Sequence, residues 1–175
     1  MENKKFVTRT TAADLFRFQI YHTYMGIMGF LLGLLAVVAL ADLIGNFSNM
    51  NTGTKILCLV LILWATILNP VNMYFRAKKQ VQTVELFKNP IDLEIGEKGL
   101  TITQGENGGL VEWKNVTKIV ILKKLAIFYM GKVRAHLLPL DQIPEEADEA
   151  VELVKNYAKG IRIVNRRKGR RKQKA

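Results

Sequence analysis

Two long uncharged runs constrain the fold of this chain more than any other feature. Residues 18–41 and 56–75 hold 24 and 20 residues without a formal charge, counting His22 as neutral. A helix needs about 20 mainly apolar residues to cross the hydrocarbon core of a bilayer. The runs therefore predict two transmembrane helices, at 24–42 and 56–75, joined by a short external connector at 43–55.

Two other interpretations of these runs are open from the sequence. Both could be buried helices of a soluble protein, although two runs of this length so close together argue against it. The first run could also belong to a cleaved signal, because Ala39, Leu40 and Ala41 resemble a small-residue cleavage site. The run is, however, longer than the apolar region of about 7–15 residues usual in signal peptides.

The basic residues around the runs predict how the hairpin is oriented. Four basic residues precede the first run and three directly follow the second, whereas the connector contains one. Short loops rich in lysine and arginine stay in the cytoplasm. We therefore expect a multi-pass protein of the cell membrane with both termini in the cytoplasm. Its flanking parts are an amphipathic N-terminus at 1–23 and a helical linker at 76–90.

Local signals mark features of the helices. Thr11 followed by Asp14 is typical of a helix N-terminus, because threonine can cap it and an acid favours its first turn. Pro70 lacks an amide donor and predicts a kink near the cytoplasmic end of the second helix. Asn69 and Asn72 flank this position. We expect them either to hydrogen-bond to the first helix or simply to lie at the membrane interface.

Small residues follow one face of the first transmembrane helix. Gly26, Gly29, Gly33 and Ala36 share this face, and Gly29 with Gly33 gives the spacing that lets two helix backbones approach closely. We expect the glycines to pack against the second helix of the same chain. Packing between two copies, which would make a homo-oligomer, is the alternative interpretation.

From residue 91 the hydrophobic period changes to two, which indicates strands. Six short strands are expected, at 91–95, 100–104, 110–113, 116–122, 125–130 and 133–138. After Pro144 a helical apolar stripe returns and ends near Gly160, a residue suited to a helix C-cap. The expected fold class is membrane α + β. A two-helix transmembrane hairpin is followed by a small antiparallel partial β-barrel at 91–160, capped by a C-terminal amphipathic helix.

The final residues, 161–175, form a basic tail. It holds eight positive charges and no acid, and removing it lowers the formal net charge from +11 to +3. Such a segment cannot build a core and is expected to be disordered. It is the candidate contact for anionic lipid head groups or an acidic protein partner, through Arg162, Arg166, Arg167, Lys168, Arg170, Arg171, Lys172 and Lys174. Nucleic acid is less favoured because no aromatic residue interrupts the basic run, and a role in fixing topology alone is the remaining alternative.

No catalytic or metal-binding constellation stands out. His22, His136 and the single Cys58 lie in different predicted elements and cannot assemble a zinc site, so His136 is expected to be a partly buried strand residue. Ser48, the only serine, lies in the connector, and no nucleophile–base–acid set is evident. Neither apolar run carries a charge, which argues against a transport path. We expect no enzyme activity and no cofactor.

Trp113 is the most conspicuous residue of the strand-rich segment. It alternates with Leu100, Ile102 and Val111 on one predicted face, which favours an anchor of the core over a ligand contact. Trp113-Lys114-Asn115-Val116 before a β-hairpin, with Leu138-Pro139-Leu140 before the last helix, resembles the YcxB-like family of bacterial membrane proteins. The resemblance covers about residues 6–158. It implies a cytoplasmic domain similar to a pleckstrin-homology fold. The resemblance supplies this architecture but does not indicate a chemical activity.

These observations predict a non-enzymatic integral membrane protein that displays a pleckstrin-homology-like interaction domain to a partner the sequence does not name. The alternative is an accessory subunit of a membrane transport or export complex, assembled through its transmembrane helices. The two hypotheses differ in which part of the chain makes the functional contact.

Overall fold

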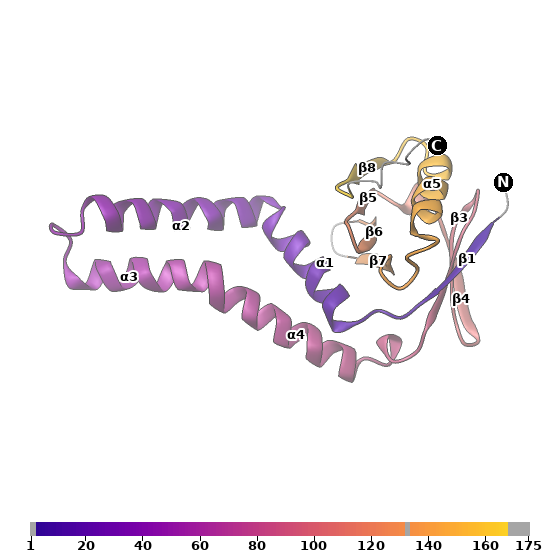
Figure 1. Cartoon of the computed structure of the whole chain (residues 1–175), viewed down its shortest axis with the longest axis horizontal. Helices are drawn as coiled ribbons and strands as arrows, with labels where there is room; N and C mark the ends of the chain where they lie inside the picture. Colours follow the sequence, from indigo (N-terminus) through magenta and orange to yellow (C-terminus); the bar gives the residue numbers. More distant parts are fainter. Residues whose placement is uncertain (1–2, 132–133, 168–175) are drawn as a thin grey trace. The chain divides into compact units, whose positions relative to one another are not determined.

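The structure is a computed structural model that describes residues 3–131 and 134–167. The chain divides into two compact units. One, the helical unit, comprises residues 15–83, and the other, the sheet unit, comprises residues 1–14 and 84–175. Figure 1 shows the elements of both in the order of the chain.

The helical unit contains four α-helices and one π-helical turn. The elements are α1 (Ala12–Tyr24), α2 (Ile27–Gly45), α3 (Thr52–Leu63), the π segment η1 (Trp64–Leu68) and α4 (Asn69–Thr83). The last three run on as one helix of 32 residues. This helix and α2, with 19 residues, are long and apolar enough to cross a membrane. Only 11% of the most apolar stretch of each helix is buried in the structure. This argues against the interpretation of the two helices as core helices of a soluble protein.

Capping residues account for the helix ends. Thr11 and Asp14 form the expected cap of α1: the Thr11 amide donates to Asp14 Oδ2 over 3.0 Å, and the Asp14 amide to Thr11 Oγ1 over 3.3 Å. Asn51 caps α3 by accepting from the Thr54 amide over 2.8 Å. The first transmembrane helix begins later than predicted, because Gly26 takes an extended conformation and separates α2 from α1.

Gly26, Gly29 and Gly33 do not pack against the second transmembrane helix as expected. A Cβ on Gly29 would lie 2.2 Å from the Thr23 carbonyl oxygen, so Gly29 accommodates the last turn of α1 rather than the second transmembrane helix. A Cβ on Gly26 would lie 3.2 Å from the His22 carbonyl oxygen, and one on Gly33 would meet nothing within 4 Å. Gly26 and Gly29 therefore belong to the bend between α1 and α2, and the hairpin does not use Gly33 for close approach.

Asn69 forms a hydrogen bond to the first part of the hairpin, which is one of the two roles expected for the asparagines near Pro70. Its Nδ2 donates to the Tyr24 hydroxyl over 3.2 Å, and this hydroxyl donates to the Ala65 carbonyl oxygen over 2.8 Å. The first and second parts of the hairpin are thus joined by hydrogen bonds. Phe16 and Tyr74 add an edge-to-face contact with ring centroids 5.7 Å apart.

The sheet unit contains two four-stranded sheets. The first has the order β1-β2-β3-β4, all antiparallel, with bounds Lys4–Thr8, Ile91–Ile95, Gly99–Gln104 and Asn107–Glu112. The second has the order β7-β6-β5-β8, with bounds Arg134–Pro139, Leu125–Met130, Lys118–Ile121 and Arg162–Asn165. In the second sheet β8 is parallel to β5, and the other pairs are antiparallel.

The six strands predicted from the two-residue period are confirmed, but the sheet unit differs from the prediction in three ways. The described strands form two separate sheets in place of one partial barrel. β1 comes from the N-terminal segment that was assigned to an amphipathic N-terminus. β8 lies at 162–165, inside the tail that was expected to be disordered. The sheet unit therefore extends beyond the predicted limits of 91–160 at both ends.

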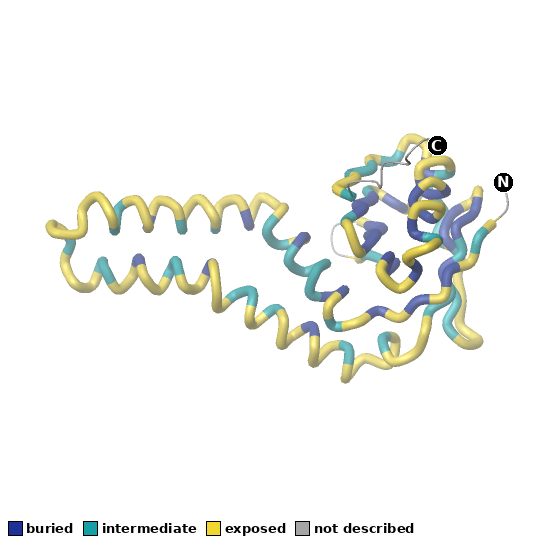
Figure 2. Tube along the Cα trace, viewed as in Figure 1, coloured by how far each residue is buried: buried dark blue, intermediate teal, exposed yellow. Residues whose placement is uncertain are grey.

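A single apolar core lies between these elements (Figure 2). The helix α5 (Ala147–Tyr157) contributes Ala147, Ala150, Val151 and Val154, and the strands contribute residues such as Phe6, Leu93 and Phe128. Trp113 packs against this core from the short 3-10 helix η3 (Trp113–Asn115), so its interpretation as an anchor is confirmed.

The strand β1 belongs to this core because one of its faces is apolar. Phe6 is 1% exposed and lies opposite Leu93 of β2, whereas the neighbouring Val7 is 57% exposed. Lys4 forms ion pairs with Glu146, the N-cap of α5, at 3.2 Å, and with Glu149 in the first turn of α5. The N-terminal strand is therefore joined to the core by burial and to α5 by charge.

We predict that Phe6→Ala lowers the free energy of unfolding of the sheet unit by about 3–5 kcal/mol, because it leaves a cavity in a packed core. Denaturant unfolding of the full chain in detergent measures this through Trp113 fluorescence, in a Trp64→Phe background. Val7→Ala is the matched control and should change the free energy by about 0.5 kcal/mol or less. Equal effects of the two substitutions would contradict the assignment of β1 to the core.

Candidate functional site

The structure incorporates the start of the basic tail into the fold. Arg162 lies in β8, and the Arg166 amide donates to the Ile121 carbonyl oxygen over 2.8 Å. Arg167 pairs with Asp148 of α5 over 2.9 Å and keeps only 18% of its side chain exposed. These three arginines therefore have structural contacts. The other five predicted contact residues lie outside the described part of the chain: Lys168, Arg170, Arg171, Lys172 and Lys174.

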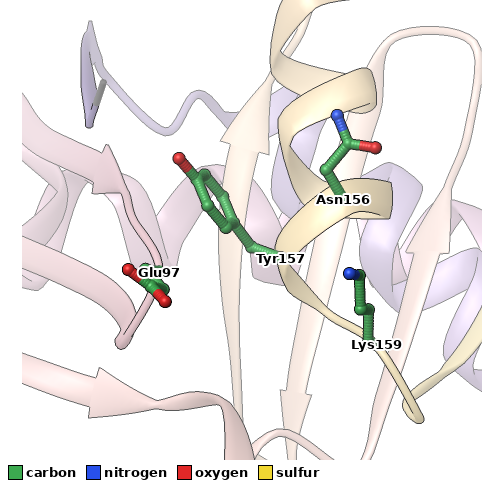
Figure 3. Close-up of a pocket in the computed structure, with 4 residues that line it drawn as sticks. All are labelled: Glu97, Asn156, Tyr157 and Lys159. Atoms are coloured by element: carbon green, nitrogen blue, oxygen red, sulfur yellow. The ribbon is translucent and has the colours of Figure 1, made fainter. Parts of the chain in front are cut away.

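A cleft in the sheet unit provides a second candidate site (Figure 3). It has a volume of about 560 Å³ and is lined by Glu97, Asn156, Tyr157 and Lys159. Glu97 lies in the turn between β2 and β3, and the other three residues lie at the end of α5 and just beyond it. Pockets for small ligands typically have volumes of about 300–1,000 Å³.

The turn that carries Glu97 is fixed by backbone geometry. The Gly96 amide donates to the Gly99 carbonyl oxygen over 3.0 Å, and Trp113 Nε1 donates to the Gly96 carbonyl oxygen over 2.9 Å. A Cβ on Gly99 would lie 2.1 Å from the Val111 carbonyl oxygen, so only glycine fits there. Trp113 thus supports the cleft indirectly, by holding the turn beside it.

The cleft is lined by charged and polar groups around one aromatic ring. It offers a carboxylate, an ammonium group, an amide and the half-buried ring of Tyr157. Glu97, Asn156 and Lys159 are exposed and keep much of their hydration, which weakens their contribution to binding. None of the described lining residues is a serine, cysteine or histidine.

The elements that carry this cleft could be predicted, but the cleft itself could not. Residues 96–99 lie between two of the predicted strands, and Asn156, Tyr157 and Lys159 lie in the predicted amphipathic helix that ends near Gly160. Their proximity depends on how α5 packs on the sheets, and local patterns carry no signal for that.

A comparison with protein-family models bears on this part of the chain. Residues 95–154 match the family model described as YcxB-like protein. The chain carries a YcxB-like segment. This segment begins at the end of β2 and extends into α5, so it contains Glu97 and Trp113 but ends before Lys159. The predicted resemblance to the YcxB-like family is confirmed over these residues. Neither the curated proteins nor the solved structures gave a match.

His136 lies in β7, inside the YcxB-like segment. It is opposite Phe128 of β6 and is partly buried, as expected. Burial lowers the pKa of its imidazole below the ordinary value of 6.5, because desolvation disfavours the charged form. Among the described residues no group of three or more His, Cys, Asp or Glu could hold a metal ion.

The lowered pKa of His136 predicts a pH dependence of stability. Below pH 6.5 the unfolded chain binds this proton more readily than the folded chain does. The free energy of unfolding should therefore fall as the pH falls from 6.5 toward the folded pKa. Denaturant unfolding between pH 8 and about 5 measures this slope.

His136→Gln removes the titrating group and should flatten the slope over the same range. The difference between the two proteins at pH 8, where the histidine is neutral, gives the effect of the substitution itself. An unchanged slope in His136→Gln would show that other groups cause the pH dependence.

Proposed function

We propose that this chain is a non-enzymatic membrane protein that displays the sheet unit, as a pleckstrin-homology-like interaction domain, at the inner face of the cell membrane. The observation that carries this proposal is the pairing of β1 with β2. β1 precedes the helical unit and β2 follows it, and Thr8 lies opposite Ile91 in the antiparallel pair. Such residues have Cα atoms about 5 Å apart. The chain therefore leaves for the helical unit and returns from it at nearly one point.

This connectivity favours an even number of membrane crossings. A chain that leaves a folded domain and returns to the same strand pair ends on the side where it began. Two helices apolar enough to span a membrane meet this condition. Basic residues flank the hairpin at both of its ends in the sequence: Arg17 precedes it, and Arg76, Lys78 and Lys79 lie at its end. This distribution favours the cytoplasm for both ends of the hairpin.

The order of elements supports a pleckstrin-homology-like domain. Such a fold consists of two antiparallel sheets followed by a C-terminal helix. Here β1–β4 and β5–β7 form consecutive antiparallel meanders, and α5 follows them. The parallel strand β8 is an addition to this order. The cleft beside Glu97 and Tyr157 gives the domain a surface for recognition.

Anionic lipid is the partner that we propose for the basic residues that follow Arg167 in the sequence. Five of the eight cations of the tail follow Arg167, with no acid among them. Each basic residue near an anionic leaflet contributes about 1 kcal/mol of attraction. This attraction is screened over about 8 Å at physiological ionic strength. The tail would therefore hold the domain close to the inner leaflet.

The test uses the full chain in nanodiscs of phosphatidylcholine, mixed with vesicles that contain phosphatidylglycerol. The protein should bind these vesicles at low salt and release them as salt rises. Truncation after Arg167 should abolish binding and leave the fold intact, because it retains β8 and the ion pair with Asp148. Truncation after Gly160 would remove β8 and confuse loss of charge with loss of structure.

A chain with the residues after Arg167 in scrambled order is the matched control, and it should still bind because the attraction depends on charge. Vesicles of phosphatidylcholine alone should bind none of the variants. Equal binding with and without the tail would contradict the lipid proposal. Binding to RNA at salt concentrations that release the vesicles would favour nucleic acid as the partner.

A further inference from the structure

The long helix of the hairpin contains one irregular turn, at η1. There the Asn69 amide donates to the Trp64 carbonyl oxygen, five residues back, instead of to Ala65. Pro70 follows directly, and a proline ring clashes with the carbonyl four residues earlier in a regular α-helix. The wider π turn relieves this clash and leaves the Ala65 carbonyl without its usual backbone donor.

The Tyr24 hydroxyl takes the place of the missing donor. It donates to the Ala65 carbonyl oxygen over 2.8 Å and accepts from Asn69 Nδ2 over 3.2 Å. An unpaired carbonyl is costly in a segment that lies in or near hydrocarbon. If the helix rewound to a regular α-helix, the Asn69 amide would bond to Ala65 and compete with Tyr24 for this oxygen.

The π turn decides which face of α4 points inward. A regular α-helix turns about 100° per residue, so Arg76 would lie about 20° from the direction of Ala65 and Ala77 about 120° from it. The π turn contains about one extra residue. It therefore brings Ala77 close to the direction of Ala65 and turns Arg76 away from it. In the structure Ala65 is 6% exposed and Ala77 is 0% exposed, whereas Arg76 is exposed. The same shift turns Met73 inward in place of Asn72.

We propose that the hydrogen bonds among Tyr24, Ala65 and Asn69 form a register lock, which holds the π turn and so sets the face that α4 presents. In the locked register the inward positions of α4 are apolar. Release of the lock would rotate α4 by about 100° relative to α3 and turn Asn72 and Arg76 inward. Tyr24 is the positioning residue of this device, because its hydroxyl reaches the Ala65 carbonyl from α1, outside the long helix.

The experiment measures which side of α4 is accessible to a thiol reagent. It uses the full chain in nanodiscs in a Cys58→Ala background, with one cysteine introduced at a time by Arg76→Cys or Ala77→Cys. With the lock intact, the cysteine at position 76 should react several times faster than the one at position 77. Pro70→Ala together with Tyr24→Phe should reverse this order, because neither the ring clash nor the competing hydroxyl then opposes rewinding.

Tyr74→Phe in the same Pro70→Ala background is the matched control, since it removes a tyrosine hydroxyl that makes no hydrogen bond among the described residues. It should keep the original order of reaction rates. An unchanged order in the Tyr24→Phe arm, or a reversed order in the Tyr74→Phe arm, would overturn the proposal. Asn72→Cys and Met73→Cys provide a second pair of positions if Ala77→Cys prevents folding.

Discussion

The pairing of β1 with β2 is the interaction on which the rest of this structure depends. The strands are separated by the whole helical unit, yet Phe6 of β1 lies against Leu93 of β2 in one core. The two apolar helices are in effect an insertion between neighbouring strands of a sheet. The two ends of such an insertion lie close together, so both must be on the same side of a membrane. An antiparallel pair of helices meets this condition, whereas an odd number of membrane crossings does not.

Charges at both ends of the sheet unit converge on the start of α5. Lys4 from β1 pairs with Glu146 and Glu149, and Arg167 after β8 pairs with Asp148. The acids of these pairs are well exposed, and exposed ion pairs contribute little to stability. The stability comes from the apolar core. The pairs link the start of α5 to β1 and to the segment after β8.

The parts of the fold that follow a local pattern could be predicted from the sequence. The apolar runs, the cap at Thr11 and Asp14, and six strands of alternating character are of this kind. β1 and β8 could not be recognised, because each lies among basic residues that suggested another structure. Short segments of this kind become strands only because a neighbouring strand supplies their hydrogen bonds.

The features that carry the functional argument depend on contacts distant in sequence. The Tyr24 hydroxyl meets the Ala65 carbonyl across 41 residues, and the cleft joins Glu97 to Lys159. Gly29 was expected to approach the second helix and instead accommodates the end of α1, because the break at Gly26 turns the chain there. Spacing along one helix identifies a face but not the element that covers it.

We propose that the hairpin crosses the membrane twice and that the sheet unit lies on the cytoplasmic side. The most direct test is to measure on which side of the membrane each end of the chain and the connector lie. A reporter active only in the cytoplasm should work when fused before Met1 or after Ala175, and it should be silent when inserted at Asn49 between α2 and α3. Activity at Asn49 with silence at the two termini would contradict the account.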